Sequence, residues 1–187
     1  LMAGCAALVK PSEVTPRFVE PMRAVLAQVP ELPLAYVMGG PEVGQTLIAQ
    51  VDYVCFTGST ATGRKVAEAA ARHLIPANLE LGGKDPMIVT ASADPRWAAQ
   101  VALRSSVVAT GQVCQSIERV YVARAIAGPF LAALAEEANK TELTYPDPAS
   151  GHIGPFIFPA QADKVQAQID AAVTQGARVL TGGTVEV

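Results

Sequence analysis

One cysteine of this sequence stands in a setting that suits covalent chemistry. Cys114 lies in the stretch 111–116, GQVCQS, where a glycine leaves room around the thiol and polar neighbours favour a loop over a core. A cysteine thiolate is a strong nucleophile for carbonyl carbon. Cys5 and Cys55 lie in or beside apolar runs instead, and we expect both to be inert core residues. A lone loop cysteine can be incidental, so a second group has to support a catalytic interpretation.

Glu80 could supply that second group as a proton acceptor. It stands between Leu79 and Leu81 at the end of an expected strand, directly before Gly82-Gly83. We expect the two leucines to leave it half-buried, which would disfavour its charged form and suit a general base near neutral pH. The alternative is an exposed glutamate at a strand end.

A glycine-bearing turn could bind phosphate. Gly58, Ser59, Thr60 and Gly63 belong to the segment 58–63, GSTATG, which follows an apolar strand and opens an Ala-rich helix. Backbone N–H groups and the positive end of a helix attract anions there. The spacing is not the usual G-x-G-x-x-G, and such a turn also occurs without a ligand.

A second turn carries groups that could bind sugar hydroxyls. Lys10, Ser12 and Glu13 belong to the segment KPSE, which follows the apolar run 6–9. Ligands of open α/β sheets bind at the carboxyl ends of strands. A carboxylate there can accept from ribose hydroxyls and a lysine can donate to them. The alternative is a solvated turn with a capping serine.

The elements that must position these groups alternate along the chain. Apolar runs predict strands at 6–9, 34–38, 53–57, 78–81, 86–89, 119–123 and 178–180. Helical spacing and start signals predict helices at 16–28, 42–50, 61–73, 95–108, 126–138 and 160–175. Thr15 is the expected N-cap of the first helix, and a Pro-rich loop is expected at 145–159. This order predicts an α/β fold with an open parallel sheet buried on both faces.

The pattern restarts after Gly82-Gly83, so we expect one domain over 1–82 and another over 83–187. The first residues read as the tail of a helix already under way, and the chain does not begin with Met. We therefore expect an internal fragment of a longer protein, with both domains incomplete. The hypothesis follows that these 187 residues alone are inactive and poorly soluble.

Composition argues against several other classes. The net charge is −3 and no Lys/Arg cluster forms a patch, so nucleic-acid binding is not expected. The apolar runs are far shorter than the roughly 20 residues that span a bilayer, so no membrane association is expected. Three cysteines without a C-x-x-C pair, and two distant histidines, argue against a disulfide framework and a metal site and favour the cytoplasm.

Taken together and in this order, these segments resemble the aldehyde dehydrogenase superfamily over essentially Leu1–Val187. The most specific matches are 79–84, LELGGK, and 111–114, GQVC, and 58–63 matches the family's G-x-T-x-x-G turn. The resemblance implies an atypical Rossmann-like cofactor domain joined to an α/β catalytic domain, with the active site in the cleft between them.

The resemblance also implies roles. Cys114 would be the nucleophile that forms a thiohemiacetal and then a thioester, and Glu80 the base that activates the hydrolytic water. The reaction would be oxidation of an aldehyde to a carboxylic acid, with NAD as the cofactor and NADP as its alternative. The implied cofactor-binding residues are Lys10, Ser12, Glu13, Gly40, Gly58, Ser59, Thr60, Gly63 and Leu81, and no metal is implied. The parent would be a homodimer or homotetramer.

The sequence departs from the family in one visible place and leaves several choices open. Ala109 stands five residues before the nucleophile, where the family often has Asn, and the family's oxyanion-binding Asn would lie before Leu1. Arg119 could anchor the carboxylate of a semialdehyde or serve as a structural arginine. Glu13 favours NAD over NADP. Transfer of the acyl group to coenzyme A, and a non-catalytic binding or structural relative, are the alternative functions; Glu80 and Cys114 argue against them.

Overall fold

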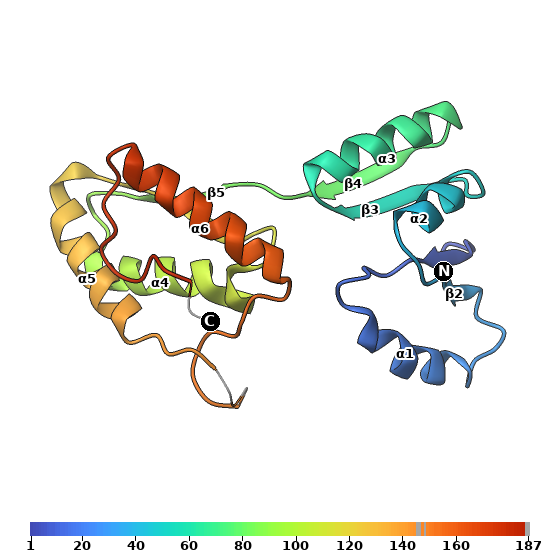
Figure 1. The fold of residues 1–187 in the computed structure, drawn as a ribbon, viewed down its shortest axis with the longest axis horizontal. Helices are drawn as coiled ribbons and strands as arrows, with labels where there is room; N and C mark the ends of the chain where they lie inside the picture. The colour runs from blue at the N-terminus through green and yellow to red at the C-terminus, as the bar shows by residue number, and fades with distance from the viewer. Residues whose placement is uncertain (145–146, 148, 186–187) are drawn as a thin grey trace. The chain divides into compact units, whose positions relative to one another are not determined.

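The computed structural model describes residues 1–144, 147 and 149–185. The chain forms two compact units, Leu1–Leu81 and Gly82–Val187 (Figure 1). This division falls one residue before the expected boundary. Each unit is built from parallel strands joined by helices, so the expected α/β class is confirmed.

The first unit begins with a short parallel pair. Strand β1 (Ala7–Val9) pairs with β2 (Leu34–Tyr36), and the connection runs through a 3-10 turn, η1 (Pro16–Phe18), and helix α1 (Val19–Leu26). Val19 is the buried anchor of this connection, with 1% of its surface exposed. Thr15 makes no capping hydrogen bond, which corrects our expectation. Pro16 opens the 3-10 turn, and the regular helix begins only at Val19.

A second parallel pair completes this unit. Helix α2 (Pro41–Ile48) leads to β3 (Val54–Gly58), and α3 (Thr60–Arg72) carries the chain back to β4 (Ala77–Leu81). The register places Thr57 opposite Glu80 and Gly58 opposite Leu81. Figure 1 shows α3 lying along this strand pair.

Only one face of the β3–β4 pair is covered by the described residues. Val54, Phe56, Leu79 and their in-phase neighbours are partly buried, whereas Cys55, Thr57, Asn78 and Glu80 are exposed. Successive strand side chains point to opposite faces, and a crossover helix covers one of them. The expectation of a sheet buried on both faces is therefore wrong for these residues, and so is that of Cys55 as a core residue. Cys5 is exposed as well.

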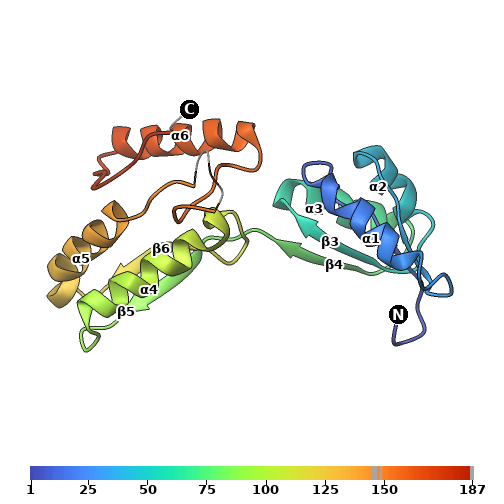
Figure 2. The same ribbon diagram turned by 90° about the horizontal axis from the view of Figure 1, so that it is seen from below.

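The second unit holds the main apolar core. Strand β5 (Asp85–Val89) pairs with β6 (Ile117–Val122), and α4 (Pro95–Val107) and the 3-10 turn η2 (Val108–Gly111) connect them. A 3-10 turn, η3 (Arg124–Ile126), and helix α5 (Ala127–Asn139) follow, with α6 (Pro159–Thr174) last. Figure 2 shows α4 and α5 beside this strand pair. The buried core consists of Val89, Ala98, Ala99, Ala102, Phe130 and Ala133.

Small residues and a cap explain how α4 packs. Three alanines let it approach its neighbours closely, and Phe130 of α5, 1% exposed, fills the remaining space. Burying such a side chain contributes about 1.5–3 kcal/mol. Asp94 caps the helix by accepting from the Trp97 N–H at 2.7 Å. A cap of this kind contributes about 1 kcal/mol.

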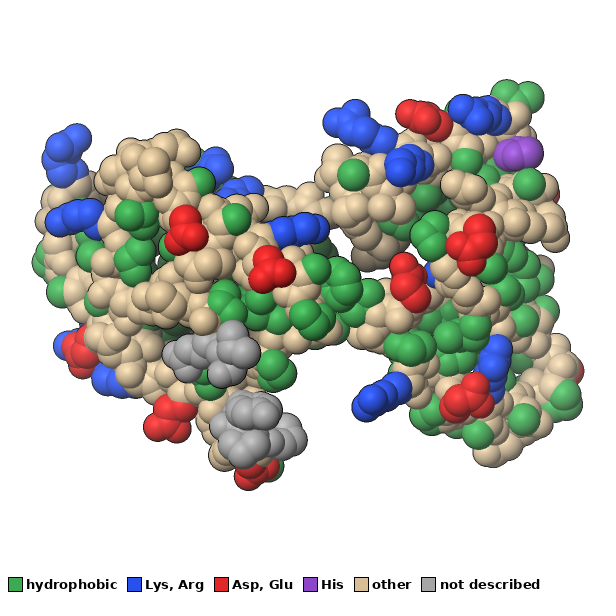
Figure 3. Space-filling model, in the orientation of Figure 1, with side chains coloured by type: hydrophobic (Ala, Val, Ile, Leu, Met, Phe, Trp, Pro, Cys, Tyr) green, Lys and Arg blue, Asp and Glu red, His purple; other side chains and the backbone are tan. Residues whose placement is uncertain are grey.

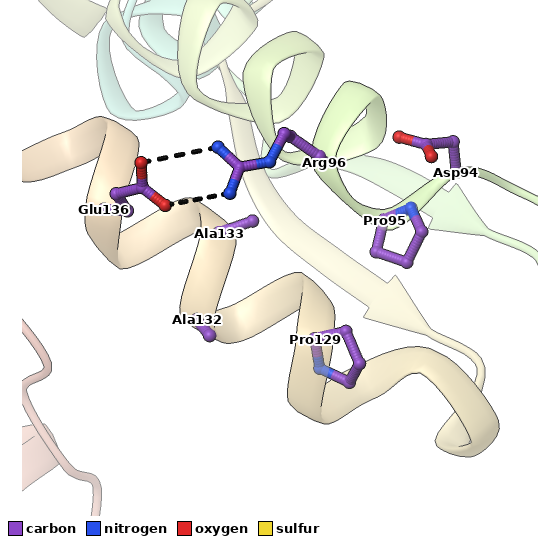
Figure 4. A pocket seen from close by; sticks show the side chains of 7 residues that line it. All are labelled: Asp94, Pro95, Arg96, Pro129, Ala132, Ala133 and Glu136. Atoms are coloured by element: carbon purple, nitrogen blue, oxygen red, sulfur yellow. Dashed lines mark hydrogen bonds and ion pairs between the residues drawn. The ribbon is translucent and has the colours of Figure 1, made fainter.

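An ion-pair network links α4 to α5 on the surface. The Arg96 guanidinium reaches both carboxylate oxygens of Glu136, at 3.4 and 3.2 Å (Figure 4). The Lys140 ammonium reaches Glu136 at 2.9 Å. Hydrogen bonds from Lys140 and then from Arg96 hold the pKa of the Glu136 carboxyl below its usual value. The network ties the two helices together where both are exposed.

The predicted strand 178–180 does not form. Residues 177–180 are irregular, and Val179 and Leu180 are 48% and 54% exposed. A strand needs a neighbour that accepts and donates ladder hydrogen bonds, and the described residues offer none there. Of the expected loop 145–159, residues 145, 146 and 148 lie outside the described residues.

The chain exposes far more surface than its mass requires. Its accessible area is 13,248 Å² for 19.4 kDa, whereas two separate compact units of half this mass would expose about 10,000 Å². Large apolar side chains contribute to this surface in both units, among them Leu74, Ile88 and Tyr121. Figure 3 shows hydrophobic side chains on the visible face of each unit. Among the described residues no helix is long and apolar enough to cross a membrane, and no cluster of side chains could hold a metal ion.

Candidate active site

The predicted nucleophile lies at an exposed turn of the second unit. Cys114 follows η2 and precedes β6, and the turn is closed by the Ser116 N–H donating to the Val113 carbonyl at 3.2 Å. All three cysteines are exposed free thiols. Exposure therefore does not single out Cys114, whereas its turn between two anchored elements does.

The backbone before this turn is left-handed over three residues. The φ angles are +48° at Ala109, +60° at Thr110 and +72° at Gly111. Only glycine, and less readily Asn or Asp, adopts this conformation without a cost of about 1–2 kcal/mol per residue. Asn, which the family resemblance leads us to expect at position 109, would adopt this backbone at a lower cost than Ala109 does.

Close packing and a hydrogen bond hold the ends of the turn in place. Gly111 lies against the backbone of α4, where an added Cβ would come 2.9 Å from the Ser106 carbonyl oxygen, so only glycine fits there. The Ser106 hydroxyl lies 2.8 Å from the Ala102 carbonyl and 2.7 Å from the Ile117 carbonyl. With one proton it donates to one of these oxygens at a time, and so links the end of α4 to the start of β6.

Gln112 is a residue whose role the sequence pattern did not predict. Its side-chain amide donates to Thr110 Oγ1 and, at 3.2 Å, to the Pro155 carbonyl, and it accepts from the Ile157 N–H at 2.9 Å. These contacts join the turn 109–114, called the nucleophile turn below because it ends at the predicted nucleophile, to a segment 43–45 residues away. In the sequence, the pair Gly111-Gln112 marks this turn, but it does not indicate which distant residues Gln112 contacts.

Glu80 lies on the open face of the β3–β4 pair in the first unit. It is exposed, which corrects the expectation of a half-buried carboxylate, and its nearest polar contact is Asn78 Nδ2 at 3.5 Å. The flanking Leu79 and Leu81 point to the opposite, covered face, so they do not bury it. An exposed carboxylate is free to meet water, but these residues alone give it no apolar surroundings.

The turn after β1 gathers charged and backbone groups. The Lys10 ammonium donates to the carbonyls of Pro11 at 2.8 Å and Gly39 at 2.9 Å, and lies 3.5 Å from Glu13. Its three protons thus have acceptors within the chain. A hydrogen bond from its own backbone and then the charge of Lys10 hold the pKa of Glu13 below its usual value. Glu13, whose side chain is 60% exposed, is the more available of the two for a ligand.

The neighbouring predicted contacts are occupied locally. Ser12 Oγ accepts from the Val14 N–H at 3.2 Å, which makes it a turn residue. Gly40 caps α2, and its N–H donates to Glu42 Oε1 at 3.0 Å. The structure therefore brings Lys10, Glu13 and the Gly39-Gly40 backbone to one end of the β1–β2 pair.

The turn after β3 forms a helix start that suits an anion. Ser59 is the N-cap of α3: its hydroxyl accepts from the Thr62 N–H at 3.2 Å and donates to Thr62 Oγ1 at 3.0 Å. The amides of Thr60 and Ala61 have no acceptor within the helix, as in any first helical turn. They are the donors that this turn offers to a ligand.

Two glycines make the approach to this helix start possible. A Cβ at Gly58 would lie 2.6 Å from the Phe56 ring, and one at Gly63 would lie 2.6 Å from Leu81 Cδ2. Leu81 therefore packs against α3 in this unit. A side chain at Gly63 would have to displace Leu81, and one at Gly58 would have to displace the Phe56 ring, so glycine suits both positions.

The remaining surface features carry none of the predicted site residues. The pocket in Figure 4 lies between α4 and α5 and is lined by Asp94, Arg96, Glu136 and their neighbours. A second, more apolar groove is lined by residues of α4, α5 and 179–181. Arg119, on β6, donates to the Tyr121 hydroxyl at 3.3 Å and is exposed.

Comparison with known proteins gives a consistent result. The family model described as "Aldehyde dehydrogenase family" matches residues 1–187. A provisionally named succinate-semialdehyde dehydrogenase [NADP(+)] from Mycolicibacterium smegmatis is 40% identical over 99% of this chain and 36% of its own length. The chain thus spans little more than a third of this curated relative.

Solved structures agree in fold. A provisionally assigned aldehyde dehydrogenase, PutA, from Anabaena variabilis is 52% identical, with a TM-score of 0.97 over all of this chain and 40% of that one. A point mutant of a betaine aldehyde dehydrogenase from Staphylococcus aureus, in complex with NAD+ and with a BME-modified cysteine, is 32% identical, with a TM-score of 0.90 over 96% of this chain and 37% of that one. The chain belongs to the aldehyde dehydrogenase family.

Proposed function

We propose that the full-length protein containing this chain oxidises an aldehyde to a carboxylic acid with NAD(P)+, with Cys114 as the nucleophile. The observation that carries this proposal is the exposed Cys114 thiol on a turn that a left-handed backbone run and several hydrogen bonds hold in shape. Family membership supplies the reaction class.

The first step forms a bond between the Cys114 sulfur and the aldehyde carbon. The thiolate attacks, and the electron pair of the C=O π bond moves to oxygen, giving a thiohemiacetal oxyanion. Such an oxygen needs N–H donors placed where the charge develops. The Cys114 N–H suits this role because no described residue accepts from it.

The residues of the first unit fit a dinucleotide cofactor. The free first-turn amides of α3 can donate to a pyrophosphate, and the close packing at Gly58 and Gly63 keeps this turn tight. The exposed Glu13 carboxylate can accept from ribose hydroxyls. We assign the binding role to Lys10, Ser12, Glu13, Gly40, Gly58, Ser59, Thr60, Gly63 and Leu81. When bound, the nicotinamide supplies the hydride acceptor for the thiohemiacetal carbon.

Glu80 takes part in the release of the product. It removes a proton from water, the water oxygen bonds to the thioester carbon, and the C–S bond breaks to return the Cys114 thiolate. Its exposure in this unit lets water reach it. Transfer of the acyl group to coenzyme A would not need this glutamate, so its presence supports hydrolysis.

Glu13 also bears on the choice of cofactor. A glutamate with an ordinary or lowered pKa is negatively charged at neutral pH, so Glu13 would repel the 2′-phosphate of NADP. The relative complexed with NAD+ supports NAD, whereas the name of the Mycolicibacterium relative specifies NADP(+). We propose NAD as the preferred cofactor and NADP as the alternative.

The wider assignments rest on the same resemblance. Residues 1–82 would belong to a cofactor-binding domain and 83–187 to a catalytic domain, and the parent would be a cytoplasmic homodimer or homotetramer. The substrate is a small-molecule aldehyde.

The test is reduction of NAD by the full-length protein with a panel of aliphatic, aromatic and semialdehyde substrates, with NADP in parallel. We expect aldehyde-dependent reduction that is abolished by Cys114→Ala and that needs no coenzyme A. Activity that requires coenzyme A would support the acylating alternative. No reduction with any aldehyde, with or without coenzyme A, would contradict the enzyme assignment.

A further inference from the structure

We propose that Gln112 is a positioning residue that fixes Cys114 for attack by tying the nucleophile turn to the main chain of residues 155–157. This inference rests on the proposed function, because it concerns the placement of the proposed nucleophile. Gln112 itself need not touch the substrate. Its effect would pass along the backbone through Val113, since two peptide bonds separate Gln112 from Cys114.

The side-chain amide of Gln112 acts toward the distant segment as a peptide group does. Nε2 donates to the Pro155 carbonyl at 3.2 Å, and Oε1 accepts from the Ile157 N–H at 2.9 Å. The second Nε2 proton is directed to Thr110 Oγ1. The orientation of the amide follows from these partners, since the flipped amide would face a carbonyl with its oxygen and an N–H with its nitrogen.

The segment that Gln112 holds has few other attachments. Ile153 is anchored by hydrogen bonds with Glu142 and Thr144, and Phe158 begins the approach to α6. Between them, the hydrogen bonds that the described residues make with the backbone of 154–157 are those to Gln112. Gly154 also lies against the nucleophile turn, because a Cβ there would come within 3.3 Å of Thr110 Cγ2. The two segments are thus in direct contact, and Gln112 fixes their alignment.

The turn needs such a tie because its own backbone is costly. Ala109 and Thr110 adopt positive φ, and neither residue type favours it. A strained conformation persists only where its surroundings fix it, and such strain is typical of functional sites. Without Gln112, the run 109–111 is free to relax toward right-handed backbone, and Cys114 would move with it.

The chain supplies a matched control. Gln166, on α6, makes the same pair of contacts elsewhere in the second unit: Nε2 donates to the Gly183 carbonyl at 3.2 Å, and Oε1 accepts from the Val185 N–H at 2.9 Å. Gln166→Leu therefore removes an equivalent two-ended contact with no connection to the Cys114 turn. Differences between Gln112→Leu and Gln166→Leu isolate the effect of position from the effect of losing such a contact.

The experiment measures three quantities on the full-length protein and both variants: amide hydrogen exchange at Ile157 and Val185, the rate of Cys114 alkylation by iodoacetamide, and kcat and KM for aldehyde oxidation. We expect Gln112→Leu to speed exchange at Ile157 only, to change the alkylation rate of Cys114 but not of Cys5 or Cys55, and to lower kcat roughly 10- to 100-fold. Gln166→Leu should speed exchange at Val185 only and leave kcat within about 2-fold, because the hydrogen bonds of the Gln166 side chain are made to Asp170, Gly183 and Val185 and not to the Cys114 turn.

Three results would overturn the proposal. One is unchanged exchange at Ile157 in Gln112→Leu, another is faster exchange with unchanged kcat, and a third is an equal loss of kcat in Gln166→Leu. If Gln112→Leu does not fold, Gln112→Glu replaces it, because the carboxylate keeps the acceptor for the Ile157 N–H but loses the donor to the Pro155 carbonyl. In that variant kcat should fall while the Ile157 amide stays protected from exchange. An unchanged kcat would refute the proposal. If the wild-type protein oxidises no aldehyde, the proposed function fails, while exchange and alkylation still decide whether Gln112 positions the thiol.

Discussion

Gly111→Ala tests whether the left-handed backbone before Cys114 is a real constraint. At φ +72° an alanine costs about 1–2 kcal/mol relative to right-handed backbone. Its Cβ would also lie 2.9 Å from the Ser106 carbonyl oxygen, and overpacking of this kind costs typically about 1–3 kcal/mol. Alanine restricts the unfolded chain and so recovers roughly 0.4–1 kcal/mol. The expected net loss of folding stability is about 1–4.5 kcal/mol.

The matched control is Gly44→Ala in the first unit. Gly44 lies in the middle of α2, and a Cβ there would meet only side-chain carbons of Lys10, at an ordinary van der Waals distance of 3.8 Å. Alanine is favoured over glycine in a helix by about 0.5–1 kcal/mol, so this variant should be slightly more stable than wild type. The two variants carry the same chemical change with opposite expected signs.

The assay is thermal melting of the full-length protein, together with the alkylation rate of Cys114. Gly111→Ala should melt earlier and alter the alkylation rate, whereas Gly44→Ala should melt at or above wild type and leave alkylation unchanged. A Gly111→Ala protein as stable as Gly44→Ala, with normal alkylation, would refute the left-handed turn and the contact with Ser106.

Two further variants test the second unit. Ser116 is 2% exposed and its hydroxyl has no hydrogen-bond partner among the described residues, so Ser116→Ala should raise stability by about 1 kcal/mol in a melting experiment; a clear loss would show that the hydroxyl is satisfied. Arg96→Gln should lower the melting temperature at neutral pH, because Lys140 and Arg96 hold the pKa of Glu136 below its ordinary 4.5. A carboxyl whose pKa is lowered in the folded state stabilises the fold above about pH 4.5, and this stabilisation is lost as the carboxyl protonates at lower pH. The difference in melting temperature between Arg96→Gln and wild type should therefore vanish in acid. A difference that persists in acid would contradict an ionic cause.

The sequence was sufficient to predict the order of elements and their parallel pairing. Apolar runs such as 53–57 and 86–89, separated by helical spacing, leave few alternatives to βαβ units. The pattern at Leu79-Glu80-Leu81 shows which residues share a face, but not what covers the second face. For this reason the burial of Glu80 and Cys55 was predicted wrongly. The strand at 178–180 failed because a strand depends on a partner, which no local pattern reveals.

The site was predictable in its residue types and not in its geometry. A glycine next to Cys114 suggested room around the thiol, and Gly111 does adopt a conformation that glycine favours. Nothing about Ala109 or Thr110 indicates left-handed backbone, because their neighbours impose it. The link from Gln112 to Ile157 joins residues 45 positions apart, which local spacing cannot predict.

The central proposal is that Cys114 forms an acyl-enzyme and that Glu80 activates the water that hydrolyses it. The most direct test is rapid-mixing measurement of NADH formation by full-length Glu80→Gln protein, followed by mass spectrometry of the peptide that contains Cys114. We predict a burst of about one NADH per site, as the acyl-enzyme accumulates, little further turnover, and an acyl group on Cys114. Steady turnover at the wild-type rate, with no acyl group on Cys114, would contradict the account.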